Sequence, residues 1–386
     1  MTQEPFGDIP LFREIQRLLA AGGGPINYEI ARQVAGAIAS QGARGSPPSP
    51  ESSRALDAAV HQSETILSGY TRLPLEEPQQ ARLVDRAWWI SSTLDSWKWL
   101  LEHLAARFLG EMGKMGPEQA GENPLQSAMG QIAPLLLGIQ VGTLMGNLAR
   151  EQLGRYDLPI PRDDDGRLFV VGVNAEALAA DYGVSAERVQ QWIALNEVAR
   201  GLVFGHARWL TRYFKSLLTE LVDSIEIDTA ALERRLTDLQ AGGMESLEET
   251  MNVEQALPIV PSERHSRALR NIQAFVALLE GYAHHASTKV ADQVVEQPGK
   301  IEELMVRRAT TPTDGERLLS GLLGLSFDRA LEQSGATFCA AVVSLKGLPA
   351  LNRVWDAPDN LPSLAEIKDP FQWMERVHES STGETP

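Results

Sequence analysis

Apolar residues recur at helical spacing through most of the chain. From Pro10 they occupy positions 11, 12, 15, 18 and 19, which is the spacing of one helix face. Glycine and proline clusters at 42–50 and 113–124 separate such segments. Further helices are predicted over residues 27–40, 79–111, 185–224, 229–240, 263–290, 314–325 and 329–345. The pattern therefore predicts a mainly α protein.

One segment departs from the helical period. Residues 167–174 are rich in β-branched and aromatic side chains, which favours a strand, so we expect a minor β component there. The run Asp163–Asp165 just before it predicts a solvated turn. A calcium loop is disfavoured, because an EF-hand needs oxygen ligands at further positions and a terminal Glu.

The breaks divide the chain into three expected regions. Residues 1–112 form an N-terminal helical region and residues 124–350 form the core that carries the candidate motif. Residues 351–386 are rich in proline and tryptophan, and we expect this tail to wrap around the body.

Charge excludes two classes of partner. The 386 residues include 35 Lys and Arg against 51 Asp and Glu, a net charge of −16. This charge repels phosphate backbones and anionic headgroups, so no nucleic-acid or membrane role is expected. The N-terminal residues lack the apolar segment of a secretory signal, which predicts a cytoplasmic protein.

The most hydrophobic stretch runs from Ile132 to Leu148 and contains a proline and a glutamine, so it falls short of a membrane span. Gly138, Gly142 and Gly146 follow at intervals of four and predict close packing against another helix. The single cysteine, Cys339, has apolar neighbours, which predicts a packed core thiol.

The helix through residues 191–204 is apolar around nearly its whole circumference, so it should be buried. It nevertheless contains Asn196, Glu197 and Arg200. A buried carboxylate needs a partner or an upward pKa shift, and Arg200 is three residues from Glu197 on the same face. These residues occupy the frame of H-E-x-x-H, in which two histidines hold zinc and the Glu activates water. Asn196 and Arg200 stand at the histidine positions; neither is an ordinary zinc ligand, and Arg200 would repel the ion.

A second helix, over residues 268–290, has an apolar stripe with Glu280 and His284 one turn apart at its edge, and His285 on the opposite side. Two readings stay open. Glu280 and His284 could chelate a metal together. In the favoured reading, Glu280 instead forms a buried ion pair with Arg200.

Several blocks run in order from one end of the chain to the other, and through them the chain resembles a bacterial family of hydrolases classed as zincin-like metallopeptidases. The blocks are Gly7–Leu19, Leu153–Pro161, Ala194-Leu-Asn-Glu-Val-Ala-Arg200, Arg208–Leu210, Leu278–Tyr282, Leu351–Trp355 and Trp373–Val377. In many relatives the block at Ala194 reads A-L-H-E-[VL]-T-H, which implies a zinc-peptidase-like site on this helix. Of the two histidines and the glutamate of that motif, this chain keeps only the glutamate, Glu197. By analogy with the zinc site of such proteins, the resemblance implies that Glu280 stands at the position of the third zinc ligand.

We therefore predict a zincin-like family protein without the usual zinc site, which binds a peptide or protein as a pseudoenzyme and needs no cofactor. Its cleft should lie between the 167–174 strand and the Glu197 helix, with Asn196, Arg200, Glu280 and His284 as binding residues. The strand would pair with an extended peptide along its edge. The alternative is an active hydrolase with Glu197 as general base and zinc held by an unusual set such as Glu197, Glu280 and His284.

Overall fold

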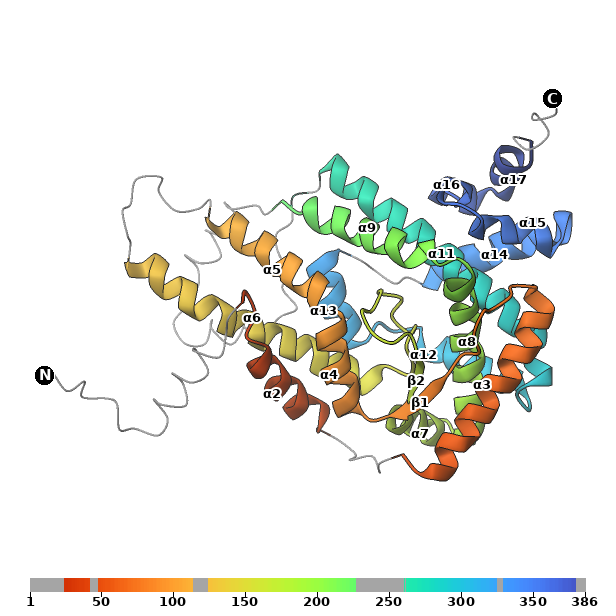
Figure 1. Cartoon of the computed structure of the whole chain (residues 1–386), viewed down its shortest axis with the longest axis horizontal. Helices are drawn as coiled ribbons and strands as arrows, with labels where there is room; N and C mark the ends of the chain where they lie inside the picture. Colours follow the sequence, from red (N-terminus) through yellow and green to blue (C-terminus); the bar gives the residue numbers. More distant parts are fainter. Residues whose placement is uncertain are drawn as a thin grey trace, which may run out of the picture.

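The computed structural model describes residues 24–41, 48–113, 124–226, 260, 262–324 and 329–379. Over these residues the protein is mainly α-helical with one small sheet, as predicted (Figure 1). The helices expected at 10–20 and 229–240, and most of the 42–50 segment, lie outside the described residues. The main helices are α2 (Tyr28–Ala39), α3 (Pro50–Thr71), α4 (Arg86–Ser96), α5 (Lys98–Gly113), α6 (Pro124–Glu151), α7 (Gly172–Asp181), α8 (Ala186–His206), α9 (Trp209–Asp223), α11 (Glu263–Val290), α12 (Pro298–Arg308), α13 (Asp314–Leu323), α14 (Arg329–Lys346), α15 (Leu348–Asn352), α16 (Leu364–Lys368) and α17 (Pro370–Glu379).

Two long helices of the prediction are divided in the structure. The 79–111 segment contains strand β1 (Ala81–Val84), followed by α4 and α5, so a single helix there is wrong. The Asp85 side chain accepts a hydrogen bond from Trp88 N at 2.7 Å and thereby caps the start of α4. The 185–224 segment is likewise two helices, because the chain leaves the helical conformation at Ala207 between α8 and α9.

The sheet lies at the centre of the molecule (Figure 1). β1 pairs in parallel with β2 (Leu168–Val171), which confirms the strand expected within 167–174. The opposite edge of β2 carries an antiparallel bridge from Gly154 to Val170, and Val171 N donates to Leu153 O at 2.9 Å. Both edges of β2 are therefore occupied, and the expectation that a peptide pairs with this strand is wrong.

The glycines of α6 pack against α2 as their spacing predicts. A Cβ atom at Gly138 would lie 2.6 Å from Asn27 O, and one at Gly142 would lie 2.7 Å from Ala31 O. Glycine is needed here because the two backbones approach too closely for any side chain. No helix in the described part of the chain is long and apolar enough to cross a membrane.

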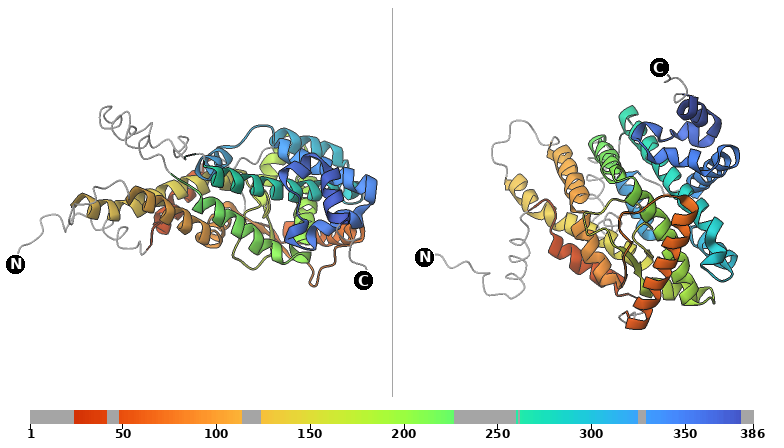
Figure 2. Two further views of the ribbon diagram at one scale, coloured as in Figure 1. Left: turned by 90° about the horizontal axis from the view of Figure 1, so that it is seen from above. Right: turned by 45° about the vertical axis from the view of Figure 1, so that its right-hand side comes forward.

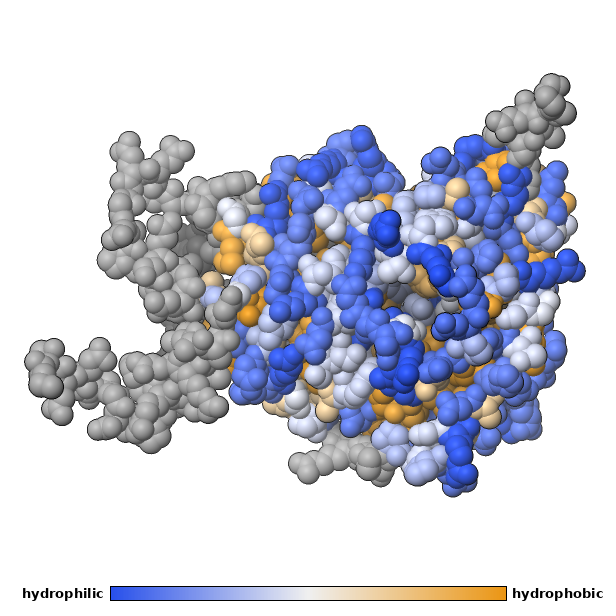
Figure 3. All heavy atoms as spheres, in the orientation of Figure 1, coloured by the Kyte–Doolittle hydropathy of each residue, from blue (hydrophilic) through white to orange (hydrophobic). Residues whose placement is uncertain are grey.

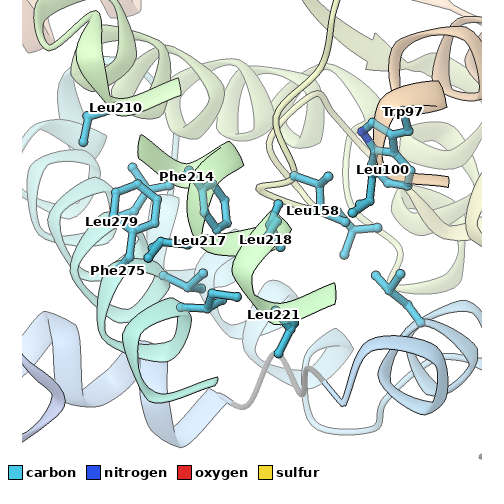
Figure 4. Close-up of a cluster of buried hydrophobic side chains, with 14 of the residues drawn as sticks. Trp97, Leu100, Leu158, Leu210, Phe214, Leu217, Leu218, Leu221, Phe275 and Leu279 are labelled. Atoms are coloured by element: carbon cyan, nitrogen blue, oxygen red, sulfur yellow. The ribbon is translucent and has the colours of Figure 1, made fainter. Parts of the chain in front are cut away.

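The largest hydrophobic core joins α9 and α11. Phe214 of α9 packs against Phe275 of α11 with ring centroids 4.6 Å apart, among the leucines drawn in Figure 4. Cys339 is fully buried in the same core, and burial raises the pKa of its thiol, as expected for a packed thiol. The rings of Trp373 in α17 and Phe338 in α14 make an edge-to-face contact. This contact anchors the C-terminal helices at one end of the body (Figure 2).

Hydrophilic residues cover most of the face shown in Figure 3. This distribution fits the excess of acidic residues in the composition. The apolar residues are gathered mainly in the two buried clusters that α8 and α11 share.

Candidate functional site

Helix α8 is the centre of the candidate site. It packs against α3, α7 and α11, and its apolar residues are buried around most of its circumference, as its sequence predicts. Glu197 lies in its middle and is only 3% exposed. The predicted burial of this carboxylate is thus confirmed.

The hydrogen-bond partners of Glu197 are backbone amides. Arg155 N donates to Oε2 at 2.8 Å, and Tyr156 N donates to Oε1 at 3.0 Å. A Cβ atom at Gly154 would lie 2.6 Å from the carboxylate, so only glycine allows this approach. Burial raises the pKa of Glu197 to about 8, against the opposing effects of the Arg200 charge and these two N–H groups.

Arg200 forms an ion pair with Glu280 of α11. Its Nε lies 3.0 Å from Oε1 and 3.1 Å from Oε2, and Nη2 also donates to Oε2. The two side chains are 16% and 10% exposed. This is the ion pair favoured by the sequence. The positive charge of Arg200 is therefore matched by Glu280 across the interface of α8 and α11.

The other two predicted residues also face the site. Asn196 donates from Nδ2 to Trp192 O at 2.9 Å, one turn earlier in α8. His284 is half-exposed, and its Nε2 lies 4.0 Å from Oε1 of Glu302 in α12. His285 was expected on the side of the helix opposite the apolar stripe. It is buried there and hydrogen-bonded to the Tyr70 hydroxyl at 3.0 Å, because α3 covers that face of α11.

The segment over residues 151–157 is held in place by two polar side chains. Arg308 of α12 donates to Glu151 O at 2.8 Å and to Asp157 Oδ2 at 3.0 Å. Asn174 of α7 donates to Gln152 O within the segment and to Ala149 O just before it. These contacts fix the backbone that binds Glu197.

Sequence reasoning missed this segment and Arg308 as parts of the site. The contacts to Glu197 come from main-chain N–H groups, which every residue except proline carries, so no residue type marks them. The one available signal was the block at Leu153–Pro161, which carries the family resemblance.

A cleft of about 400 Å³ opens beside these residues. Asn196, Glu197, Arg200, Glu280 and His284 all line it, so the structure brings the predicted residues together. The walls come from α8, α11, α12, α14 and the 153–157 segment.

The donor set at this cleft does not fit a zinc ion. Zinc takes thiolate, neutral imidazole or carboxylate ligands in a tetrahedral shell. Here the histidine positions of the motif hold an amide, Asn196, and a guanidinium, Arg200, while both oxygens of Glu280 accept hydrogen bonds from Arg200. Among the described residues no group of three or more His, Cys, Asp or Glu side chains is arranged to hold a metal ion.

Helix α8 thus carries Glu197 in the frame of H-E-x-x-H and faces helix α11, which carries Glu280. A family model described as zincin-like metallopeptidase matches residues 26–374, and the chain belongs to this family. No curated protein matches the chain.

One solved structure has a similar fold. It is described as a putative hydrolase with a novel fold from Chloroflexus aurantiacus and has a TM-score of 0.66. The sequences are 24% identical over 92% of this chain and 99% of that one, so the comparison supports the fold alone.

Proposed function

We propose that this chain is a zincin-like family member that binds a peptide or protein segment in the cleft beside Glu197 without a catalytic zinc ion. The observation that carries the proposal is the ion pair of Arg200 with Glu280 at the motif helix. A guanidinium is always charged at neutral pH and repels a divalent cation. Glu280, the acidic residue placed for metal binding, already has its two oxygens engaged.

Polar groups at the cleft support a peptide as the ligand. Asn196 uses its Nδ2 within α8, and its Oδ1 accepts no hydrogen bond from the described residues. Arg200 uses Nε and Nη2 for Glu280, and its Nη1 makes no hydrogen bond within the same part of the chain. One acceptor and one donor, a helical turn apart, complement the N–H and C=O of a peptide backbone.

One observation favours the alternative of an active hydrolase. A carboxyl group with a pKa of about 8 titrates in the range where a general base works, and Glu197 lines the cleft. Against this, both Glu197 oxygens already accept backbone N–H groups, and these hydrogen bonds oppose the uptake of a proton from water. We therefore favour binding.

The first experiment measures metal content and hydrolysis together. Protein purified without chelators is analysed for zinc by mass spectrometry and assayed with a fluorogenic peptide mixture, alongside Glu197→Gln. We expect substoichiometric zinc and no hydrolysis that depends on Glu197. One zinc per chain, or hydrolysis lost in Glu197→Gln, would overturn the proposal in favour of the hydrolase.

The second experiment measures binding. Octapeptides selected from a random library are titrated against the wild type and Asn196→Leu, which removes the unpaired acceptor. The matched control is Asn271→Leu, because Asn271 is exposed on α11 away from the cleft. We expect weaker binding only in Asn196→Leu; equal affinity in all three proteins contradicts the assigned site.

A further inference from the structure

A second, larger cavity lies further along α8. Its volume is about 620 Å³, and it is lined by the last turns of α8, the 75–80 segment and the 155–168 loop. Gly201, Phe204 and Gly205 contribute the α8 wall, whereas the cleft described above lies along Trp192 to Arg200. The segment at 154–156 separates the two cavities, since Gly154 lines the first and Arg155 and Tyr156 line the second.

Arginines and carboxylates form ion pairs around this cavity. Arg155 and Arg162 share Asp164, at 2.7 and 3.0 Å. Arg82 and Arg167 share Asp165. Of these arginines, Arg155, Arg162 and Arg167 line the cavity, together with three carboxylates, Asp164, Asp165 and Glu77. In a chain of net charge −16, the charges around this cavity are balanced.

Two of these arginines have unused hydrogen-bonding capacity. The Arg155 side chain is only 8% exposed, and its Nε has no hydrogen-bond partner. The Arg167 side chain is 53% exposed and lies 3.6 Å from Asp165, and it donates no hydrogen bond to any described residue. A guanidinium with free N–H groups binds a carboxylate through two parallel hydrogen bonds.

Part of the remaining wall is apolar. Tyr156 and Phe204 stack with ring centroids 5.3 Å apart and planes 3° apart. Leu75, Pro159 and Pro161 line the same cavity. The lining thus offers the half-exposed Arg167 beside a hydrophobic surface, which suits a ligand that has both an anionic group and an apolar body.

We propose that this cavity is a second binding site for a ligand that carries a carboxylate next to an aromatic or proline side chain, such as the C-terminal residue of a peptide. Arg167 binds the carboxylate, and the Tyr156–Phe204 surface contacts the ring. The inference does not depend on what the cleft at Glu197 binds.

The test uses N-acetyl-phenylalanine and its C-terminal amide as probes, titrated by calorimetry or ligand-observed NMR. We expect the carboxylate to bind about tenfold more tightly than the amide, the difference made by one charged hydrogen-bonding pair. Arg167→Gln should abolish this preference while leaving the fold intact, because the side chain is exposed. Thr211→Glu, which places a negative charge at the cavity, should weaken carboxylate binding.

Ser216→Glu is the matched control, since Ser216 is exposed on the same helix α9 and does not line the cavity. It should bind as the wild type does. Equal affinity for the acid and the amide in the wild type, or a preference that survives in Arg167→Gln, would overturn the proposal.

Discussion

Arg200 of α8 and Glu280 of α11 form a two-pronged ion pair, with Nε 3.0 and 3.1 Å from the two carboxylate oxygens. The pair joins the helix that carries the motif to the helix that faces it. In the H-E-x-x-H frame, Arg200 stands where the second zinc-binding histidine would be. Opposite charges thus make direct contact at this position of the frame.

Removal of one partner should be costly. Arg200→Met leaves Glu280 without its cation in a site where the carboxylate is 10% exposed. We expect a loss of about 3–5 kcal/mol in the free energy of unfolding, measured by urea denaturation. The double variant Arg200→Met/Glu280→Leu removes both charges and should recover most of that loss.

The matched control is Arg307→Ala. Its partner Glu303 is on the same helix α12, and both side chains are more than half exposed. For this variant we expect the free energy of unfolding to change by less than about 0.5 kcal/mol. If Arg200→Met is as mild as this control, the ion pair does not stabilise the helix interface.

Glu197 should make stability depend on pH. Its pKa rises from 4.5 to about 8 on folding, chiefly through burial. Between these values the folded chain keeps a proton that the unfolded chain has released, so stability is greatest at low pH and falls as the pH rises towards 8. From pH 6 to pH 8 the loss should be about 2–3 kcal/mol, at roughly 1.4 kcal/mol per unit.

The measurement compares urea unfolding of the wild type and Glu197→Gln at several values between pH 6 and 8.5. The variant lacks the titrating group. The difference between its unfolding free energy and that of the wild type, followed against pH, therefore isolates the contribution of Glu197. Glu303→Gln, at an exposed position, serves as control and should follow the wild type. A constant difference between wild type and Glu197→Gln across this range would mean that Glu197 is ionised throughout.

The contact of α6 with α2 can be tested by adding one methyl group. At Gly142 a Cβ atom would lie 2.7 Å from Ala31 O and 2.8 Å from Val34 Cβ. Gly142→Ala should therefore destabilise the protein by about 1–3 kcal/mol, although alanine is the better helix former. At Gly110 of α5 nothing lies within 4 Å, so Gly110→Ala should stabilise by about 0.5–1 kcal/mol. If alanine stabilises the protein at both positions, α6 and α2 do not approach each other closely at Gly142.

Local pattern predicted α8, α11 and the 167–174 strand, because each has a long or distinct run of apolar residues. It failed at Ala81–Val84, whose four residues form a strand only because Leu168–Val171 lies beside them. Such pairing is non-local, so no pattern within the segment itself indicates it. The edge of β2 was misjudged for the same reason, since Gly154 covers it from a distant part of the chain.

At the site, charge and burial were enough to predict that Glu280 would meet Arg200. The partners of Glu197 were not predictable, because the Arg155 and Tyr156 amides carry no side-chain signature. The Asp163–Asp165 run was expected to be solvated. Asp164 instead pairs with Arg155 and Arg162, which hold the pKa of its carboxyl at about 2 although burial acts to raise it.

The last prediction concerns repair of the motif. Asn196 and Arg200 are one turn apart on α8, and both line the cleft with Glu280. The change of both to histidine places two imidazoles on the same face of the helix and releases Glu280 from Arg200. Two imidazoles and a carboxylate form a common zinc shell, so Asn196→His/Arg200→His should bind zinc more tightly than the wild type does.

Zinc calorimetry on folded proteins measures the effect, with circular dichroism to confirm helicity. Asn196→His alone is the control, because it keeps the guanidinium in place and should gain little affinity. Loss of Arg200 can also weaken the fold, since Glu280 is left unpaired until a metal binds. The unfolding temperature of the double variant should therefore rise when zinc is added. A folded double variant with the zinc affinity of the wild type would show that these positions do not share one ion, and that α8 is not a degraded zinc helix.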